Sequence, residues 1–520
     1  MLQLEPPAHA AAAASRRPSA RLAHHAPLLG VLLLGCASVF AHGGDVFAKY
    51  PRGDGGLFYA ICDRLIAGNL AYPREIDYNG FQIPFSYSPL AFYCVALIAR
   101  ALGAWPPHVM NVWVIAWDFA FAPAAYWAAL QFLKNRQQAL VAAAFLIVCP
   151  GNLAYLGMGG AMTRAPGFVM YLLACGATWR ALRERSRPMT AWSIVFGALA
   201  AWTHMEFLFL YVVSALLMAV GRPSLETFRR AALLFGGIAA LAFPWLLLAR
   251  FNVSSIASAL RTTHGVQSFV AIEGLLRYFG LTPVQNWVGL LGFVCLVAAY
   301  ASKRKLWLGW ALTLVALDSR GGLQAAYLPL ALAVGWASSH LNARVKERGY
   351  LPAAALIAAI TFEVAAATAA DESSSYARLD DTAVASMRWM AAHLEPNARV
   401  FTESAALPIG ADQAYEWLPV FARRSSPITY QGLEWVDVPT YQAYQRRFYT
   451  LQRTCVAAGA DCLVRLAGDL GPSVAPAYLW LRPDERGADQ PVLRDLKQSS
   501  KLKFVRADAS GALFRLEPKE

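Results

Sequence analysis

A single carboxylate in a glycine-rich segment is the first candidate for chemistry in this sequence. Asp54 lies between Gly53 and the pair Gly55–Gly56, so the backbone can turn tightly and present the carboxylate without crowding. A carboxylate presented in this way can act as a general base toward a reacting hydroxyl group. Apolar residues also recur at helical spacing through Gly55–Ala67, and Gly68 follows. Asp54 is therefore predicted to be a catalytic base or the N-cap of a short helix, and the two roles are compatible.

Further charged residues lie much later in the chain, at the ends of apolar segments. Arg164 follows a Gly-Gly pair, His204 and Glu206 lie in a short turn, and one serine separates Asp318 from Arg320. Each also has a simpler explanation. The arginines could anchor lipid headgroups, and the histidine and glutamate could form a hydrogen-bonded turn.

The composition excludes an ordinary soluble enzyme. Hydrophobic residues make up 57% of the 520 residues and charged residues only 15%. The net charge is +13, but most lysines and arginines of the first 350 residues fall in short clusters between apolar runs. Such clusters are typical of the cytoplasmic loops of membrane proteins, so no nucleic-acid partner is expected. The sequence predicts an α-helical protein that crosses a membrane many times.

The basic clusters also predict the side of the membrane that each connection occupies. If all of them are cytoplasmic, neighbouring clusters bracket two crossings each, and residues 1–26 form a disordered cytoplasmic tail. About eleven transmembrane helices are then expected, at 27–44, 108–133, 138–157, 165–182, 189–204, 206–221, 231–249, 284–301, 306–318, 322–340 and 350–369. The first apolar run, Pro27–Ala41, could instead be the apolar core of a signal peptide that is cleaved off.

This topology leaves one apolar stretch unassigned. Pro89–Ala104 carries Arg100, and counting it as a crossing would invert every later connection. It is therefore predicted to lie on the outer membrane surface, paired with the helix at 55–67. The transmembrane domain then covers 27–370, with a first outer loop at 45–104.

The composition changes to that of a soluble domain after Ala370. We expect a small α/β domain at 371–520 on the outer side, with a helix from Asp380 through Leu394. Arg399–Phe401, Cys462–Arg465 and the closing segment LKFVRADASGALFRLE are predicted strands, and the last folds into a hairpin at residues 508–511.

Two smaller features leave alternatives open. Asp118 falls inside the second predicted crossing, so it should face the interior of the bundle, as a structural partner or with a direct role. The eight cysteines show no metal-binding spacing. Cys455 and Cys462 lie in the polar C-terminal part, where they either form a disulfide after export or are kept apart by a helix.

Several short phrases resemble the GT-C superfamily of membrane glycosyltransferases, in its bacterial branch that uses polyprenyl-phosphate sugars. They are YPRGDGGLFY, YNGFQIPFSYSPLAFY, GGAMTRAPGF, WTHMEFLF and YEWLPVFARRSSPITYQGLEW. The resemblance implies a multi-pass protein of the inner (plasma) membrane, with a cytoplasmic N-terminus and a periplasmic or extracellular C-terminal domain. It implies transfer of a sugar, with inversion, from a polyprenyl-phosphate-linked donor to a glycan, lipid or protein acceptor.

The resemblance also suggests roles for the residues. Asp54 would be the base, while Arg164 and Arg320 would hold the donor phosphate, because guanidinium groups bind phosphate oxygens in pairs. Substrate or supporting roles would fall to the remaining candidates, Asp45, His204, Glu206, Asp318, Glu416 and Glu434. GT-C loops often carry paired acids, whereas the Gly-flanked acid here is single, so a divalent cation stays an open question.

Two aromatic patches in the C-terminal part have two interpretations. Glu416–Pro419 and Gln431–Trp435 each combine a glutamate with a tryptophan, as sites that stack on sugars do. The alternative is that Trp417 and Trp435 belong to the core.

Two other functions compete with sugar transfer from a lipid monophosphate. A translocase for lipid-linked sugars would more often show internal repeats and charged residues at mid-membrane, and only Asp118 points that way. An O-antigen ligase or polymerase would use pyrophosphate-linked donors instead.

Overall fold

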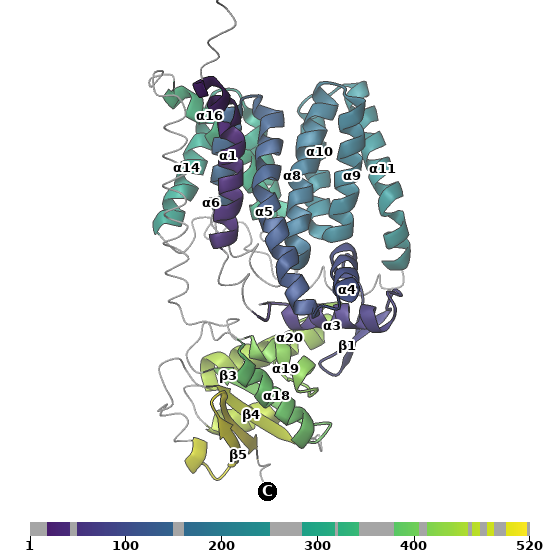
Figure 1. The fold of residues 1–520 in the computed structure, drawn as a ribbon, viewed down its shortest axis with the longest axis vertical. Coiled ribbons are helices and arrows are strands. Elements are labelled where there is room, and N and C mark those ends of the chain that lie inside the picture. Colours follow the sequence, from purple (N-terminus) through teal and green to yellow (C-terminus); the bar gives the residue numbers. More distant parts are fainter. Residues whose placement is uncertain are drawn as a thin grey trace, which may run out of the picture.

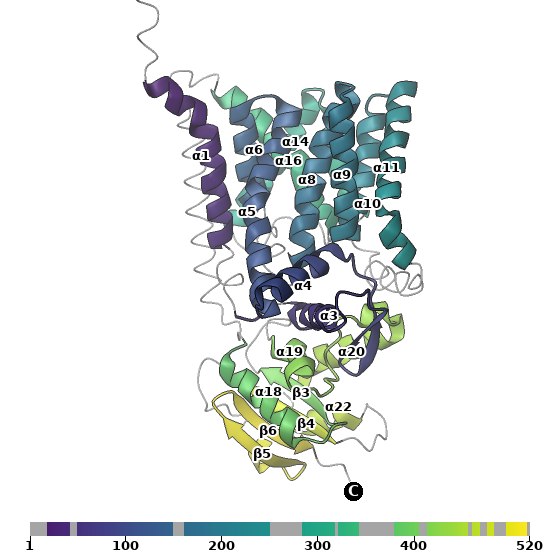
Figure 2. The same ribbon diagram turned by 45° about the vertical axis from the view of Figure 1, so that its right-hand side comes forward.

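The computed structural model describes residues 18–41, 49–51, 53–148, 161–249, 283–317, 321–342, 379–404, 413–455, 460–468, 476–482 and 496–516. These residues form a bundle of long helices, a thin layer of short elements below it, and a C-terminal unit beneath that layer (Figures 1 and 2). We call the described residues of 49–104 the junction layer and those of 379–516 the C-terminal unit.

Within the described residues, ten helices occupy segments where transmembrane helices were predicted. They are α1 (Pro18–Ala41), α5 (Pro106–Leu133), α6 (Arg136–Val148), α8 (Ala161–Arg183), α9 (Arg187–Thr203), α10 (Met205–Val220), α11 (Leu225–Ala249), α14 (Pro283–Ala301), α15 (Lys305–Leu317) and α16 (Gly321–Asn342). Two of them, over Pro106–Leu133 and Leu225–Leu248, are by themselves long and apolar enough to cross a membrane. The segment 350–369 lies outside the described residues, so the number of crossings stays a prediction.

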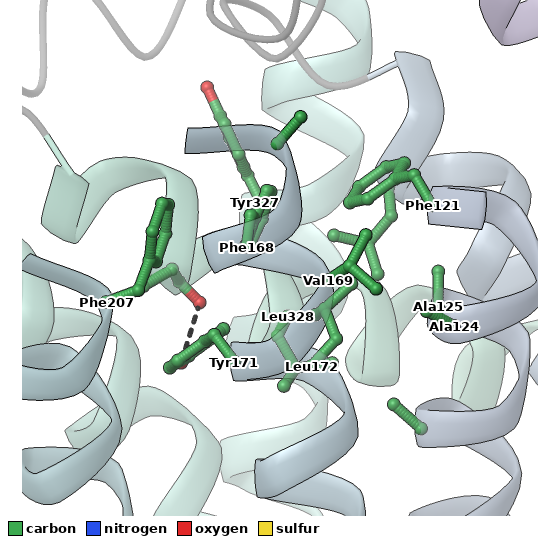
Figure 3. Close-up of a cluster of buried hydrophobic side chains, with 14 of the residues drawn as sticks. Phe121, Ala124, Ala125, Phe168, Val169, Tyr171, Leu172, Phe207, Tyr327 and Leu328 are labelled. Atoms are coloured by element: carbon green, nitrogen blue, oxygen red, sulfur yellow. Dashed lines mark hydrogen bonds between the residues drawn. The ribbon is translucent and has the colours of Figure 1, made fainter. Parts of the chain in front are cut away.

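Aromatic side chains fill the centre of the bundle. Phe168 of α8 lies between Phe121 of α5 and Phe207 of α10, with ring centroids 5.2 Å away in both cases (Figure 3). Aromatic pairs of this kind add about 0.5–1.5 kcal/mol each to the stabilisation from burial. Large apolar side chains, such as Leu233 and Phe243 of α11, are instead exposed on the outside of the bundle. An apolar exterior around an apolar core is the distribution expected for helices in lipid.

Helix α1 is joined to the bundle by a polar contact. Ser38 donates a hydrogen bond to Asp118 of α5 at 2.6 Å, and Asp118 is fully buried. The prediction that this carboxylate faces the interior is confirmed, and Ser38 provides a structural partner. A Cβ atom at Gly35 would press on Phe119, so α1 also approaches α5 closely.

Basic side chains gather at one end of the bundle. Lys134, after α5, pairs with Glu184, after α8, at 2.8 Å. Arg183 lies close enough to Arg222 and Arg304 to experience their charges. The connections after α5, α8, α10 and α14 therefore share the end that lies opposite the C-terminal unit (Figure 2).

The junction layer consists of two helices and a hairpin. Helices α3 (Gly55–Ala67) and α4 (Leu90–Leu102) pack on each other, with Phe58 and Phe92 centroids 5.0 Å apart. Both helices were predicted, and α4 lies across the end of the bundle (Figure 2). Strands β1 (Glu75–Tyr78) and β2 (Phe81–Pro84) were not predicted. Asn79 and Gly80 connect them with positive φ angles of 56° and 76°, as a two-residue hairpin turn requires.

The C-terminal unit is a four-stranded sheet with helices. Its helical elements are α18 (Asp381–His393), α19 (Ala414–Phe421), the 3₁₀ turn η2 (Leu433–Trp435), α20 (Val438–Thr450), the π-helical turn η3 (Leu451–Cys455) and α22 (Ala460–Gly468). Its strands are β3 (Arg399–Ser404), β4 (Ala477–Arg482), β5 (Leu502–Asp508) and β6 (Gly511–Leu516), in the order β3-β4-β6-β5. Strands β3 and β4 are parallel, and the other pairs are antiparallel.

Most of the elements predicted in this unit are confirmed, and one is wrong. Asp380 caps α18 by accepting a hydrogen bond from the Ala383 amide at 2.7 Å, and the closing segment forms the β5–β6 hairpin. The strand predicted at Cys462–Arg465 is helix α22 instead. Cys462, Leu463 and Leu466 are its buried residues, and this spacing covers one face of a helix.

A disulfide joins Cys455 of η3 to Cys462 of α22, with their Cα atoms 5.0 Å apart. The sequence left open whether a helix would separate the two cysteines. Because α22 begins at Ala460, both sulfur atoms lie at the same end of the helix and can meet.

Candidate functional site

Asp54 occupies the N-cap position of α3, but its side chain makes no capping hydrogen bond. Only its backbone carbonyl takes part in the helix, by accepting a hydrogen bond from the Phe58 amide at 2.9 Å. The predicted side-chain cap is therefore wrong. The carboxylate instead faces the guanidinium of Arg164, with Oδ2 and Nη2 3.8 Å apart.

Arg164 faces this carboxylate from the end of the helix bundle. It lies in the first turn of α8, and its side chain is 13% exposed against 28% for Asp54. An ion pair of this length at a partly exposed site contributes about 0–1 kcal/mol, so a phosphate can replace Asp54 as the partner of Arg164 at little cost. The structure thus brings together two of the residues that the sequence suggested, from segments 110 residues apart along the chain.

The C-terminal unit presses against the start of α3. Tyr78 donates a hydrogen bond to the backbone carbonyl of Glu416 at 2.6 Å, and the Trp417 indole donates one to the carbonyl of Pro51 at 3.1 Å. A Cβ atom at Gly56 would overlap that same Glu416 carbonyl oxygen. The glycines after Asp54 therefore permit close approach of α19 as well as a tight turn.

The hairpin turn is bound to the same unit through Asn79. Its amide nitrogen donates to the carbonyls of Ser426 and Thr429 at 3.0 and 2.9 Å, and its oxygen accepts from the Ser426 amide at 2.6 Å. The buried side chain is thus held on both of its polar atoms, which fixes the hairpin in place. An ion pair between Lys49 and Asp381 at 2.5 Å adds a more exposed contact.

Glu434 brings a second carboxyl group from the C-terminal unit. Tyr87 donates a hydrogen bond to its Oε1 at 3.1 Å, and the Tyr87 ring lies 4.8 Å from that of Trp435. Burial, followed by the negative charge of Asp54, raises the pKa of Glu434 to about 7. The two carboxyl groups are therefore electrostatically coupled, although the sequence contains nothing that would have paired them.

Three phenol groups near the site were not singled out from the sequence. Burial raises the pKa values of Tyr78, Tyr87 and Tyr415 well above the usual range; the charge of Glu416 or Glu434 is the next cause, and Asp54 adds a smaller one. These side chains therefore stay neutral, and they donate hydrogen bonds to Glu416 and Glu434.

Glu416 and Trp417 are buried where α19 of the C-terminal unit meets the junction layer. Trp417 is fully buried, which confirms its assignment to the core. The carboxylate of Glu416 accepts hydrogen bonds from Gln431 at 2.6 Å and from Tyr415 at 3.3 Å. Trp435 is only partly buried, so the second aromatic patch faces the junction layer.

His204 and Glu206 lie in a turn that is closed by a backbone hydrogen bond, from the Phe207 amide to the His204 carbonyl at 3.1 Å. Glu206 accepts a hydrogen bond from the Gly321 amide at the start of α16, at 3.1 Å, and its other oxygen lies 3.6 Å from His204 Nδ1. A carboxylate at this position stabilises the N-terminus of α16. The remaining candidates, Asp45, Asp318 and Arg320, lie outside the described residues.

Among the described residues, no three side chains of His, Cys, Asp or Glu come close enough together to hold a metal ion. Asp54 and Glu434 are two carboxyl groups in one place, but Tyr87 already bonds to the second. This part of the chain therefore provides no complete ligand set for a divalent cation.

No protein-family model matches the chain, and no curated protein matches it in sequence. Solved structures do match its fold. ArnT from Cupriavidus metallidurans bound to undecaprenyl phosphate aligns with a TM-score of 0.54 and 13% identity, over 96% of this chain and 98% of that one. Arabinofuranosyltransferase AftD from Mycobacteria aligns with a TM-score of 0.50 and 15% identity, over 94% of this chain and 42% of AftD. Both have the GT-C fold, so the fold predicted from the sequence phrases is confirmed.

Proposed function

We propose that this chain is an inverting membrane glycosyltransferase that moves a sugar from a polyprenyl-phosphate-linked donor to an acceptor hydroxyl. The observation that carries the proposal is the Asp54–Arg164 pair, where a carboxylate and a guanidinium meet between the bundle and the C-terminal unit. Its support is a fold shared with ArnT, which has been solved with undecaprenyl phosphate bound, and with the arabinofuranosyltransferase AftD.

Asp54 acts as the general base in this proposal. Its carboxylate removes the proton of the acceptor hydroxyl while the hydroxyl oxygen attacks the anomeric carbon from the face opposite the phosphate. The bond between that carbon and the phosphate oxygen breaks, and the electron pair leaves with the polyprenyl phosphate. One displacement inverts the anomeric configuration, and the proton stays on Asp54 until it passes to solvent.

Arg164 holds the donor phosphate in this proposal and stabilises the charge that develops as the phosphate leaves. Releasing Asp54 to the acceptor and taking up the phosphate exchanges one anion for another at the guanidinium. Arg320 is the second candidate for the phosphate, because a guanidinium group can bind two phosphate oxygens at once.

The site then lies at the level of the lipid headgroups, outside the cytoplasm. The apolar exterior of the bundle supports a place in the inner membrane, and the basic end of the bundle is the cytoplasmic side by the positive-inside rule. The Cys455–Cys462 disulfide supports export of the C-terminal unit, because disulfides persist in oxidising compartments.

The test is sugar transfer by the purified protein in nanodiscs, from a panel of labelled undecaprenyl-phosphate sugars. Asp54→Asn should lower turnover by about 10²-fold or more, because the amide has no basic oxygen. Binding of undecaprenyl phosphate and the unfolding temperature should both stay at their wild-type values, since the Asp54 side chain makes no capping hydrogen bond. Asp63→Asn is the matched control, an exposed aspartate on the same helix.

Arg164→Ala should instead weaken binding of undecaprenyl phosphate together with turnover. A fully active Asp54→Asn protein would rule out the assigned base. A wild-type protein that transfers no sugar from any lipid monophosphate donor would contradict the proposed function itself.

A further inference from the structure

Two ionisable side chains near Asp54 come from opposite sides of the junction layer. The cation Arg164 comes from α8 of the bundle, whereas Glu434 comes from η2 of the C-terminal unit. Asp54 pairs with the first at 3.8 Å. It is linked to the second through Tyr87, whose ring lies 5.4 Å from that of Phe58, one turn after Asp54, and whose hydroxyl bonds to Glu434. The bundle, which contains α8, lies above α3, and the C-terminal unit lies below it (Figure 2), so Arg164 and Glu434 come from opposite sides of the junction layer.

This arrangement indicates that the two substrates approach Asp54 from different sides. A lipid phosphate is anionic and enters from the membrane, so Arg164 attracts it and Glu434 repels it. A second substrate on the far side meets two carboxyl groups, Asp54 and Glu434. A phosphate group there would meet the negative charge of Asp54, whereas a neutral hydroxyl can donate hydrogen bonds to both carboxyl groups.

The surroundings of Glu434 fit one kind of neutral molecule. Trp435 is partly exposed beside it, and its ring lies 4.8 Å from that of Tyr87. An aromatic face next to a carboxyl group suits a sugar ring, whose C–H face lies on the aromatic ring while its hydroxyls bond to the oxygens.

We propose that the acceptor is a neutral carbohydrate hydroxyl that binds between Asp54 and Glu434, with Glu434 accepting a hydrogen bond from a second hydroxyl of the same sugar. The inference rests on the proposed function and specifies its acceptor. Acceptors whose nucleophile is a phosphate should be used less well, because the charge of Asp54 opposes a second anion. Glu434 is a binding residue here, and Asp54 alone removes the proton.

The raised pKa of Glu434 is consistent with this arrangement. Near neutral pH the carboxyl group is present in both protonation states, so it can accept a hydrogen bond from a hydroxyl or donate one to it. Tyr87 donates a hydrogen bond to one of its oxygens, and backbone hydrogen bonds from Gly432 and Glu434 also hold the carboxyl group in place.

The experiment compares acceptors and variants in nanodiscs with the donor lipid that the wild type uses. The acceptors are a panel of octyl glycosides and the same glycosides carrying a phosphate. Glu434→Gln keeps the size of the side chain and an oxygen for Tyr87. Losing a hydrogen bond to a charged group should raise the acceptor KM about 10-fold, while the donor KM stays within about twofold.

Glu395→Gln is the matched control. Glu395 also accepts a hydrogen bond from a tyrosine, Tyr478, at 2.8 Å, but it lies on the outside of the C-terminal unit. Its acceptor KM should equal that of the wild type. Tyr87→Phe is a second variant, which keeps the aromatic ring and should raise the acceptor KM about threefold.

The outcomes separate this inference from the proposed function. If the wild type prefers phosphorylated acceptors, the inference is overturned while sugar transfer stands. The same holds if Glu434→Gln changes the donor KM and leaves the acceptor KM unchanged. Wild-type kinetics in both Glu434→Gln and Tyr87→Phe would do the same. A wild type without any transfer would overturn both proposals. If Glu434→Gln does not fold, the acceptor KM of Tyr87→Phe decides.

Discussion

The hydroxyl group of Tyr78 lies 2.6 Å from the backbone carbonyl oxygen of Glu416 and donates a hydrogen bond to it. This bond links the end of β1 to the start of α19, directly below the first turn of α3. Gly56 faces the same carbonyl oxygen, which leaves no room for a side chain. The position of Asp54 therefore depends on a surface of the C-terminal unit as well as on its own helix.

Replacing Gly56 by alanine should separate the two surfaces. The added methyl group overlaps backbone atoms that cannot rotate away, and overpacking of this kind typically costs about 1–3 kcal/mol. We expect a lower unfolding temperature and a loss of turnover for Gly56→Ala. Thermal unfolding by intrinsic fluorescence and sugar transfer would measure the two effects.

The matched control is Gly236→Ala. Gly236 is also a helical glycine, but nothing lies within 4 Å of a Cβ atom added there. Alanine should be neutral or slightly stabilising at that position, by about 0.4–1 kcal/mol. Equal stability and activity of the two variants would show that α19 does not rest on α3 as described.

The carboxyl group of Glu434 should make stability depend on pH. Its pKa is about 7 in the folded protein and about 4.5 when exposed, so between these values the folded state binds the proton more tightly than the unfolded state. The stability from this group is therefore complete below about pH 4.5 and lost as the pH rises through 7. Glu434→Gln should unfold at a higher temperature than the wild type at pH 8, and the difference should vanish near pH 5. A constant difference across this range would contradict the shift.

The disulfide can be tested in a variant that keeps only Cys455 and Cys462. When the protein is denatured in membranes without reductant, a polymer that carries a maleimide group should label neither cysteine. After reduction it should label both. A further Cys455→Ser change should leave one label under both conditions. Full labelling without reductant would argue against an oxidising compartment for the C-terminal unit.

The topology can be tested with reporter fusions at three described positions. Fusions after Arg185 and Lys305 should be cytoplasmic, because both belong to the basic end of the bundle. A fusion after Ala104 should be external, since it follows α4 of the junction layer. A cytoplasmic result at Ala104 would contradict the proposed orientation.

The fold was largely predictable because hydropathy and charge act locally. Apolar runs located the bundle helices, and keeping the basic clusters on one side identified Pro89–Ala104 as a surface helix. The β1–β2 hairpin was missed, although Asn79-Gly80 is a strong hairpin signal. Its strands have only four residues each and pair with each other, and the contacts that hold the hairpin in place are with the C-terminal unit. Helix α22 was missed because a short apolar run has no period that separates helix from strand.

The site was predictable only in part, because its contacts join distant segments. Asp54 stood out through its glycines, and Arg164 through its place at a helix end, and the structure brings them together. Nothing local to Glu434 or Tyr87 indicates that they meet beside Asp54. Conversely, Glu416 has the same sequence context as Glu434 but lies in the interior. The burial of each glutamate depends on how its helix packs, and the spacing of residues in the sequence does not give that packing.

The bonds of Asn79 also bear on how the protein is made. Its partners Ser426 and Thr429 follow it by 347 and 350 residues, so both are synthesised well after Asn79. At roughly 5–20 residues per second, the hairpin waits on the order of tens of seconds while the bundle is inserted. A chain that stalls before residue 426 can enter the membrane, yet it lacks the surface that fixes its carboxylate. The contacts that hold the hairpin can therefore form only after residue 429 has been synthesised, and we expect chains that end earlier to lack them.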